Sequence, residues 1–320
     1  MTGAFEPGAD WSPTAKPEAL RRRAQLLERI RSFFASKNVL EVETPVLSSA
    51  GNSDPGIRQW RTHDPEAWLR TSPEYAMKRL LAAGSGDIYE LGRVFRADES
   101  GRHHNREFTL LEWYRVGWTY HQLMDEVEEL LRYCWPGQEL TSRRIDYRQL
   151  FQQFAEIDPL RDDDDRLRAR LAAEDVALAG MSRNECLDLL LSVVIQPRLE
   201  ANTLTFLFDF PPEQAALARI RPGDSPVAER FELFLGSTEL ANGYQELTDP
   251  EEQRRRFENE NAARLRSGQA AVPIDERLLA AMRHGLPECA GVALGVDRLL
   301  MATTGAGALA DILGFDGNRA

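Results

Sequence analysis

The sequence is poor in the residues that build disulfide frameworks and metal centres. Its 320 residues include only three cysteines and five histidines. Cys134, Cys186 and Cys289 stand far apart, with no CxxC pair and no Cys/His spacing. This scatter argues against both a disulfide scaffold and a zinc site, and we expect three buried thiols in a reducing compartment.

Long apolar runs are also missing. No stretch approaches the roughly 20 apolar residues that a membrane-spanning helix needs. The opening residues, MTGAFEPGADWSP, are too polar for a secretory signal peptide. The sequence therefore predicts a cytoplasmic protein with no membrane partner.

Positive charge is scarce as well. Lysine and arginine total 39 residues against 51 aspartates and glutamates, which gives a net charge of -12. A negative field of this size argues against nucleic acid as a partner, because binding to a phosphate backbone depends on positive charge. A local basic patch is still compatible with the acidic total.

Apolar residues make up 42% of the chain, which is enough for one large domain or two smaller ones. Glycine, proline and aspartate dominate residues 1–14, and we expect these residues to form a loose tail. Apolar residues at spacings of three and four predict one helix from Pro17 to about Ser36 and another from Tyr120 to just before Pro136. The first helix carries an arginine cluster, which is either a solvated face or a docking patch for an acidic partner. The cluster consists of Arg21, Arg22, Arg23, Arg29 and Arg31.

Strands are predicted where β-branched and aromatic residues gather. These stretches are VLEVETPVLS (39–48), DIYELGRVF (87–95), FTLLEWYRV (108–116), TLTFLFDF (203–210), VAERFELFLGSTELANGYQEL (227–247) and GVALG (291–295). Pro45 interrupts the first of them, which fits a sheet edge or a subunit boundary. Helical stretches and the charge run RDDDDR predict a helical insertion over about residues 137–200, and a polar helix is predicted from Asp249 to Ser267.

The most heavily charged stretch joins two of the predicted strands. It contains Arg96, Asp98, Glu99, Arg102, His103, His104, Asn105, Arg106 and Glu107. A guanidinium fits phosphate oxygens and stays charged at any working pH, so this loop predicts a phosphate-bearing ligand held over a rigid sheet. We interpret the two histidines as loop residues near phosphate rather than as general bases.

Three other places put polar side chains among apolar ones. Glu239 and Glu246 lie in a strand and turn where a buried carboxylate is costly unless a cation or hydrogen-bond donors offset the cost. The two glutamates predict a shared magnesium site, although each could instead pair with an arginine of the charged loop. Ser72 and Glu74 lie where a predicted strand leads into a predicted helix. The two residues could bind a ligand together, or Ser72 could simply cap the helix. Arg298 follows a glycine-rich strand and supplies a second cation for the same ligand.

Three stretches resemble, in order and spacing, the three signature motifs of class II aminoacyl-tRNA synthetases: VLEVETPVLS, FRADES through HHNREFTLLEWYR, and GVALGVDR. The stretches TSPEYAMKRLL, ELANGYQELTD and GVALGVDRLLM are similar to the lysyl branch and, within it, to the stand-alone paralogues that attach β-lysine to elongation factor P. The resemblance covers the chain from about Leu20 to its C-terminus. It implies an α+β fold over residues 15–320, with an antiparallel sheet flanked by helices. It also implies a homodimer joined through the Pro45 strand and the preceding helix, and we expect no OB-fold anticodon-binding domain.

The resemblance further implies a role for individual residues. Arg96 would hold the α-phosphate of ATP, while Phe108 and Arg298 would stack on the two faces of adenine. The other implied nucleotide contacts are Ala97, Asp98, Asn105, Glu239, Leu240 and Gly295. The family's amino-acid pocket corresponds to Ser72, Pro73, Glu74, Glu112, Tyr114 and Glu246. Glu239 and Glu246 would hold Mg²⁺, and the catalytic set implied is Arg96, Glu239 and Arg298.

The sequence departs from the family pattern at three positions, Asp98, Arg106 and Ala76. Asp98 stands where motif 2 usually has glutamate, so either the shorter side chain or the following Glu99 would serve. Arg106 replaces the proline of HNPEF, and Ala76 replaces the histidine of SPEYHMK. At Ala293, charging enzymes of the lysyl branch tend to have glycine, whereas the modifying ligases have alanine.

The resemblance implies two-step acyl transfer without a protein nucleophile. A lysine or β-lysine carboxylate attacks the α-phosphate of ATP, and a lysine amine of elongation factor P then attacks the aminoacyl-adenylate. Two alternatives come from other functional classes. One is a compact synthetase that charges tRNA or another small acceptor, and the other is a non-catalytic paralogue that binds an amino acid and regulates a partner.

Overall fold

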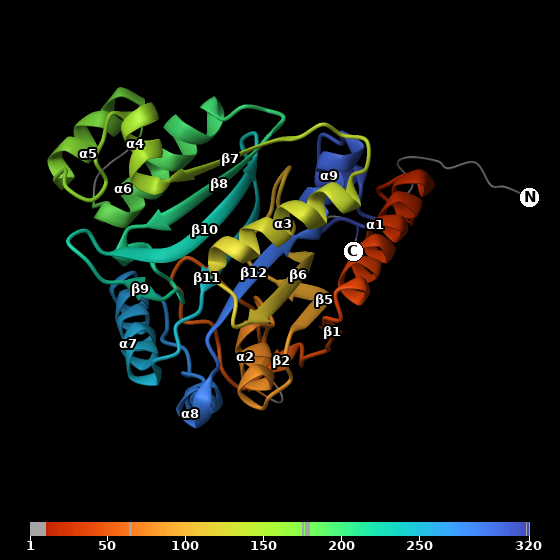
Figure 1. The fold of residues 1–320 in the computed structure, drawn as a ribbon, viewed down its shortest axis with the longest axis horizontal. Helices are drawn as coiled ribbons and strands as arrows, with labels where there is room; N and C mark the ends of the chain where they lie inside the picture. Colours follow the sequence, from red (N-terminus) through yellow and green to blue (C-terminus); the bar gives the residue numbers. More distant parts are fainter. Residues whose placement is uncertain (1–10, 64–65, 175, 177–179, 318, 320) are drawn as a thin grey trace, which may run out of the picture.

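The computed structural model describes residues 11–63, 66–174, 176, 180–317 and 319. Within them, a sheet of nine strands runs through the middle of the molecule in the order β1-β5-β6-β12-β11-β10-β8-β7, and β9 pairs with β10 (Figure 1). Its strands are β1 (Leu40–Glu41), β5 (Ile88–Phe95), β6 (Glu107–Val116), β7 (Thr141–Asp146), β8 (Thr203–Phe210), β9 (Ile220–Arg221), β10 (Val227–Leu235), β11 (Thr238–Gln245) and β12 (Cys289–Gly295).

The interior pairings from β5 to β8 are antiparallel, and only the two outermost strands, β1 and β7, pair in parallel. A second, small sheet is formed by β2 (Leu47–Ser48), β4 (Glu66–Leu69) and β3 (Arg61–His63). The predicted α+β fold with an antiparallel sheet flanked by helices is therefore confirmed.

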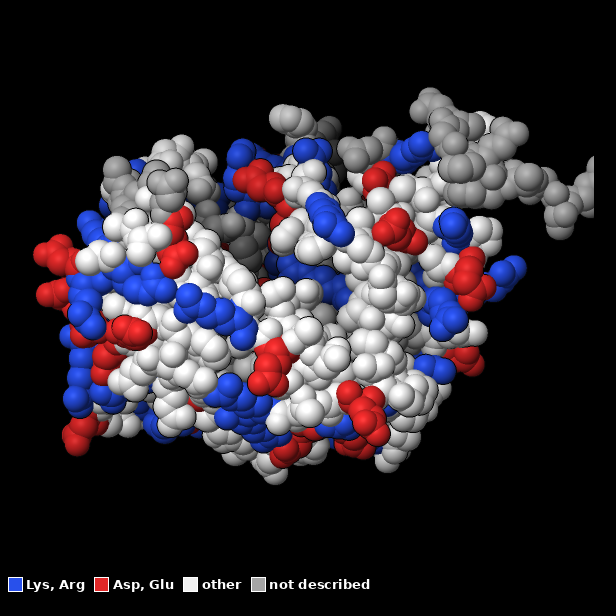
Figure 2. All heavy atoms as spheres, turned by 90° about the horizontal axis from the view of Figure 1, so that it is seen from above, with Lys and Arg blue, Asp and Glu red and all other residues white. Residues whose placement is uncertain are grey.

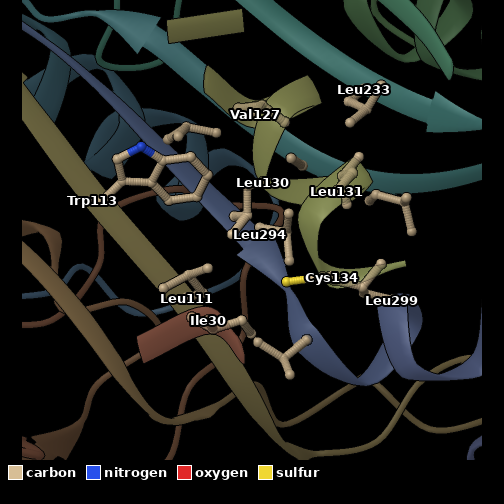
Figure 3. Packing of buried hydrophobic residues seen from close by; sticks show 14 of the residues in the cluster. Ile30, Leu111, Trp113, Val127, Leu130, Leu131, Cys134, Leu233, Leu294 and Leu299 are labelled. Atoms are coloured by element: carbon tan, nitrogen blue, oxygen red, sulfur yellow. The ribbon is translucent and has the colours of Figure 1, made fainter. Parts of the chain in front are cut away.

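Helices α1 (Pro17–Ser36), α3 (Tyr120–Cys134) and α9 (Val296–Thr304) build one apolar layer with the sheet. In Figure 3, Trp113 of β6 and Leu294 of β12 lie beside Leu130 and Leu131 of α3. All four side chains are almost fully buried, and burial of each contributes on the order of 2 kcal/mol. Because side chains alternate across a strand, the neighbours of Trp113 point to the opposite face.

The remaining helices surround the rest of the sheet. In Figure 1, α7 and α8 lie below β9 and β11, and α4, α5 and α6 gather beyond β7 and β8. They are α2 (Glu74–Ala82), α4 (Tyr147–Ala155), α5 (Asp164–Leu171), α6 (Arg183–Leu190), α7 (Pro250–Arg266) and α8 (Glu276–Gly285). Single turns of 3₁₀ or π helix lie at Ala172–Glu174, Leu191–Ile195, Gln196–Arg198, Pro212–Gln214 and Leu309–Asp311. None of the helices within these described ranges is both long and apolar enough to cross a membrane.

Two sequence predictions about the strands need correction. The stretch 39–48 is not one interrupted strand, because β1 joins the large sheet and β2 joins the small one, with Pro45 between them. The segment 137–200 is not wholly helical either, because it opens with β7, which pairs with β8. The helices of this segment share their own apolar cluster with β8 and β10, which keeps them on the sheet.

The predicted tail over residues 1–14 lies mostly outside the described residues. Of its last part, Ser12 is buried and the Thr14 N–H donates to the Gly314 carbonyl at 2.7 Å. The predicted tail is therefore too long, because the chain already packs against the protein at Ser12.

The arginine cluster on α1 is divided among several partners. Arg21 and Arg22 pair with Glu18, and Arg31 pairs with Glu41. Arg23 turns inward and binds Asp297 and the Thr109 hydroxyl. On the face drawn in Figure 2, positive and negative side chains are interspersed. The solvated-face interpretation therefore accounts for Arg21, Arg22 and Arg31, and Arg23 is a structural residue.

Candidate active site

A cavity of about 480 Å³ opens on the sheet face opposite α3. The alternation along β6 and β12 builds it, because Leu111, Trp113 and Leu294 face α3 while their neighbours face the cavity. Pairing between adjacent strands then places the cavity-facing residues of three strands side by side. Ala293 lies between Asn242 and Glu112, and Gly291 lies between Tyr244 and Tyr114.

One end of the cavity is rich in cations and has an aromatic ring. The Arg96 guanidinium lies 5.1 Å from the centre of the Phe108 ring and donates to Glu99 at 2.9 Å. Its Nε is buried without a partner among the described residues. Arg298 donates to the Glu239 carbonyl at 2.9 Å and contacts His104 Nε2 at 2.8 Å.

Most of the predicted nucleotide residues meet at this end. The cavity is lined there by Arg96, Asn105, Phe108, Glu239, Leu240, Gly295 and Arg298. Ala97 and Asp98 do not line it, because Ala97 donates its N–H to the Arg58 carbonyl and exposed Asp98 pairs with Arg58 at 3.2 Å. Glu99 lines the cavity instead, so the structure favours Glu99 over Asp98 as the motif 2 carboxylate near the ligand.

The other end gathers carboxylates. Glu112 accepts hydrogen bonds from the Ser72 hydroxyl at 2.8 Å and the Tyr114 hydroxyl at 2.7 Å. Lys78 pairs with Glu74 at 2.7 Å and with Glu246 at 2.5 Å. Three carboxyl groups therefore meet only one ammonium here, so a cationic ligand that favours their ionised forms would find acceptors in this end of the cavity.

Ser72 lines the cavity and also hydrogen-bonds to the start of α2, whose N-cap residue is Pro73. Its hydroxyl oxygen accepts from the Glu74 N–H at 3.0 Å and donates to Glu112. Pro73 does not line the main cavity, but it lines a smaller cavity of about 130 Å³ that shares Ser72 and Glu74 with the main one. Ala76 also lines that smaller cavity, so the loss of the family's histidine leaves space there rather than in the main cavity.

Burial shifts the pKa values of the carboxyl groups at this end of the cavity. Burial first, and then the charge of Glu74, raise the pKa of Glu112 to about 8, although the Tyr114 and Ser72 hydrogen bonds act against the shift. Burial also raises the pKa of Glu246 to about 7, opposed by Lys78. The pKa of Lys78 lies above its usual value, because Glu246 and Glu74 more than offset the effect of burial.

Glu246 Oε1 is buried and has no hydrogen-bond partner within the described part of the chain. A Cβ at Gly291 would lie 2.5 Å from this oxygen and 2.3 Å from the Tyr114 ring. Only glycine therefore leaves room between Tyr114 and Glu246. A buried acceptor without a donor is costly, so this oxygen is suited to a ligand ammonium.

Comparison with known proteins agrees with this arrangement. The family model described as "tRNA synthetases class II (D, K and N)" matches residues 9–319. The chain belongs to this family of class II tRNA synthetases. The resemblance inferred from the three motifs is confirmed.

Several curated relatives of this synthetase chain carry the name "Elongation factor P--(R)-beta-lysine ligase". The protein of that name from Vibrio vulnificus is 46% identical over 322 residues, which covers 96% of this chain and 98% of the relative. The one from Yersinia enterocolitica is 46% identical over 323 residues, covering 98% and 99%. The one from Proteus mirabilis is 45% identical over 323 residues, again covering 98% and 99%.

The magnesium site shared by Glu239 and Glu246 stays a prediction, and the two residues lie at opposite ends of one strand. Glu239 lies at the start of β11 and Glu246 just beyond its end, and a strand rises about 3.3 Å per residue, so the two lie roughly 20 Å apart. The described residues contain no group of three or more His, Cys, Asp or Glu side chains that could hold a metal ion. The alternative, in which each glutamate pairs with an arginine of the charged loop, is wrong, because Glu239 pairs with Arg298 and Glu246 pairs with Lys78.

Three charged residues of the site were missed from the sequence. Lys78 carries one clear signal, since it follows Glu74 by four residues on a helix. Arg230 lines the cavity from β10, where it donates to Asn242 at 3.3 Å. Glu260 reaches the cavity from the polar helix α7 and accepts from the Ser53 hydroxyl, and nothing in that helix's sequence distinguishes it from its neighbours.

Proposed function

We propose that this synthetase is a cytoplasmic ATP-dependent ligase that activates β-lysine, or a closely related diamino acid, and transfers it to a lysine side chain of elongation factor P. The observation that carries the proposal is the charge arrangement of the cavity. Arg96, Phe108 and Arg298 suit a nucleotide at one end, and Glu74, Glu112 and Glu246 suit two ammonium groups at the other. The names of the relatives support the choice of acceptor.

The first step would join the amino acid to AMP. A carboxylate oxygen attacks the α-phosphorus of ATP, the bond to the bridging oxygen breaks, and pyrophosphate leaves. Negative charge grows on the α-phosphate oxygens during the attack, so a fixed cation beside them lowers the barrier. Arg96 is proposed for this task, because its buried Nε has no protein partner among the described residues.

The second step would form the amide. The neutral amine of the acceptor lysine attacks the carbonyl carbon of the aminoacyl-adenylate, the mixed anhydride bond breaks, AMP leaves with the bonding electrons, and the amine nitrogen releases one proton to water. No side chain of this protein needs to act as a nucleophile. Its role is to hold the two reacting groups close together and to exclude competing water.

Magnesium is expected to accompany ATP. Mg²⁺ keeps several waters and is usually held by one or two carboxylates together with substrate phosphates. Glu239 fits this pattern, because its side chain lines the nucleotide end and is 39% exposed. Glu246 is fully buried against Lys78, so Glu239 is the carboxylate that we propose for the ion. When bound, the ion would supply positive charge that offsets the negative charge of the phosphates.

Intact-mass spectrometry of elongation factor P tests the proposal. The acceptor is incubated with enzyme, ATP and one amino acid at a time, chosen from (R)-β-lysine, α-lysine and ornithine. We expect a mass gain of one amino acid less water, and the largest yield with (R)-β-lysine.

Two parallel measurements separate the alternatives. Charging of tRNA in place of elongation factor P would support a compact tRNA synthetase instead. If no diamino acid supports exchange of pyrophosphate into ATP, the enzymatic proposal fails altogether.

A further inference from the structure

The last part of the chain lies against the charged loop between β5 and β6. We call residues 305–317 the C-terminal strap. The Arg102 carbonyl accepts from the Leu309 N–H at 2.9 Å, and Arg102 Nε donates to the Gly307 carbonyl at 2.6 Å. Three residues later in the loop, Asn105 Oδ1 accepts from the Gly317 N–H at 3.1 Å. The strap thus holds the loop at two points.

The strap itself is firmly anchored. Leu309, Ile312 and Leu313 are buried in the main apolar cluster. On its other side, the strap pairs with residues just before α1, since the N–H of Ala15 donates to the Leu313 carbonyl at 3.1 Å. The Thr14 hydroxyl oxygen also accepts from the Asp316 N–H at 3.1 Å. An element fixed in this way can position a loop that is largely exposed.

The contact with Gly317 fixes the orientation of the Asn105 amide. Asn105 Nδ2 donates to the Glu107 carbonyl at 2.7 Å, while Oδ1 accepts from Gly317. A flip of the amide would lose both hydrogen bonds. Because the NH₂ group carries two hydrogens, one donor stays available at the nucleotide end of the cavity, which Asn105 lines.

The close approach also depends on glycine at this position. A Cβ on Gly317 would lie 3.0 Å from Asn105 Oδ1, which is closer than ordinary carbon–oxygen contact. Leu309, from the same strap, lines the cavity directly. Strap, loop and cavity wall therefore form one continuous set of contacts.

We propose that the C-terminal strap is a positioning element for ATP, and that the Gly317 N–H holds the Asn105 amide in the orientation that binds the nucleotide. This inference rests on the proposed nucleotide site. Gly317 acts through Asn105 and does not touch the ligand. Its loss therefore weakens ATP binding and leaves the carboxylate end of the cavity unchanged.

The variant Gly317→Pro removes the N–H donor, because proline has none. Calorimetric titration with ATP is the measurement, since it does not require turnover. We expect the Kd for ATP to rise about fivefold, as for one lost neutral hydrogen bond, with an unchanged KM for the amino acid and an unchanged Tm. In an Asn105→Ala background, Gly317→Pro should cause no further loss.

Gly314→Ala serves as the matched control in the same strap. A Cβ at Gly314 meets only Leu20 at 3.5 Å, an ordinary contact, so ATP binding should match that of the unmodified protein. Should Gly317→Pro fail to fold, Gly317→Ala keeps the N–H but crowds Asn105 Oδ1, and a smaller rise in Kd is expected.

An unchanged ATP Kd in both Gly317 variants would overturn the inference. So would losses that simply add in the double variant with Asn105→Ala, because Gly317 would then act by another route. Failure of the proposed function looks different. In that case the unmodified protein itself would bind no ATP or modify no acceptor.

Discussion

Glu112 changes its protonation state within the pH range in which enzymes work. Its pKa is raised to about 8 by burial and by the charge of Glu74, so the carboxyl is mostly protonated at neutral pH in the free protein. An ammonium ligand favours the ionised form. Binding of a diamino acid therefore expels a proton, and affinity depends on pH.

The KM for the amino acid should rise as the pH falls from about 9 to about 6, by up to about tenfold per pH unit below pH 8. Glu246, whose pKa is about 7, steepens the lower part of the curve. Steady-state pyrophosphate exchange measures this dependence, and Glu112→Gln should flatten the part near pH 8. The KM for ATP is the reference, because arginine charge does not change in this range. Parallel curves for both substrates would contradict the assignment.

Arg96→Ala should reduce pyrophosphate exchange by about 100- to 1000-fold, as for other preorganised donors that stabilise transition-state charge. Stability should hardly change, because the Arg96–Glu99 pair is 30% and 27% exposed and such pairs contribute little. Exchange kinetics and thermal unfolding are the two measurements. Arg58→Ala, which breaks only the exposed pair with Asp98, is the control. Normal exchange in Arg96→Ala would remove this arginine from the chemistry.

Helix α2 is the element on which the carboxylate end depends. It places Glu74 and Lys78 one turn apart, and Lys78 reaches Glu246 beyond the end of β11. Lys78 is only 1% exposed. A buried charge that loses its partner costs far more than a surface pair contributes.

Lys78→Met should lower the free energy of unfolding by about 3–5 kcal/mol, because Glu74 and Glu246 would share a buried site with no cation. Urea denaturation measures the loss. The double variant Lys78→Met with Glu246→Gln should regain part of it, since one uncompensated charge is removed. Arg22→Met, which breaks an exposed pair with Glu18, should cost no more than about 0.5 kcal/mol. Equal losses in Lys78→Met and Arg22→Met would contradict the buried-pair argument.

Some elements were predictable from sequence and others were not, for physical reasons. The hairpin β5–β6 and helices α1 and α3 follow from the local apolar spacing, and each lies close to its predicted bounds. Strand β7 does not, because TSRRID holds one apolar residue, Ile145. It becomes a strand only because β8 offers an open edge for parallel pairing. The break between β1 and β2 likewise depends on two different partner strands.

The same limit applies to the candidate site. Arg96, Phe108 and Arg298 line one cavity, and a motif that fixes their spacing allowed their grouping to be predicted. Lys78 and Glu246 meet over a separation of 168 positions, and no local pattern encodes that contact. The sequence left open whether Asp98 or Glu99 serves, because one residue in a charged loop decides which of two adjacent carboxylates faces the cavity.

At the scale of the whole molecule, the motif 1 region exposes apolar side chains. Leu40, Val46 and Leu47 are 56%, 39% and 49% exposed and follow one another closely along the chain. Neighbouring exposed apolar side chains favour an interface. Together with the family resemblance, they support a homodimer joined through this region.

Sedimentation equilibrium at micromolar concentration should show a dimer, and Leu47→Glu should raise its dissociation constant at least about tenfold, because a charge would be buried at the interface. Leu265→Glu, on α7 and 62% exposed in the single chain, is the control and should stay dimeric. A monomer in the unmodified protein would rule out this assembly at working concentration.

Strand β12 comes last in sequence among the strands of the described residues, yet it lies between β6 and β11 in the sheet. A ribosome making this protein therefore completes both half-sheets first and leaves their facing edges open. At translation speeds of 5–20 residues per second, β6 waits on the order of 10 s for its neighbour. Open strand edges invite pairing with other chains, so the nascent protein should depend on chaperones during that interval. Enzymatic activity should then appear only once β12 and the C-terminal strap have both left the ribosome.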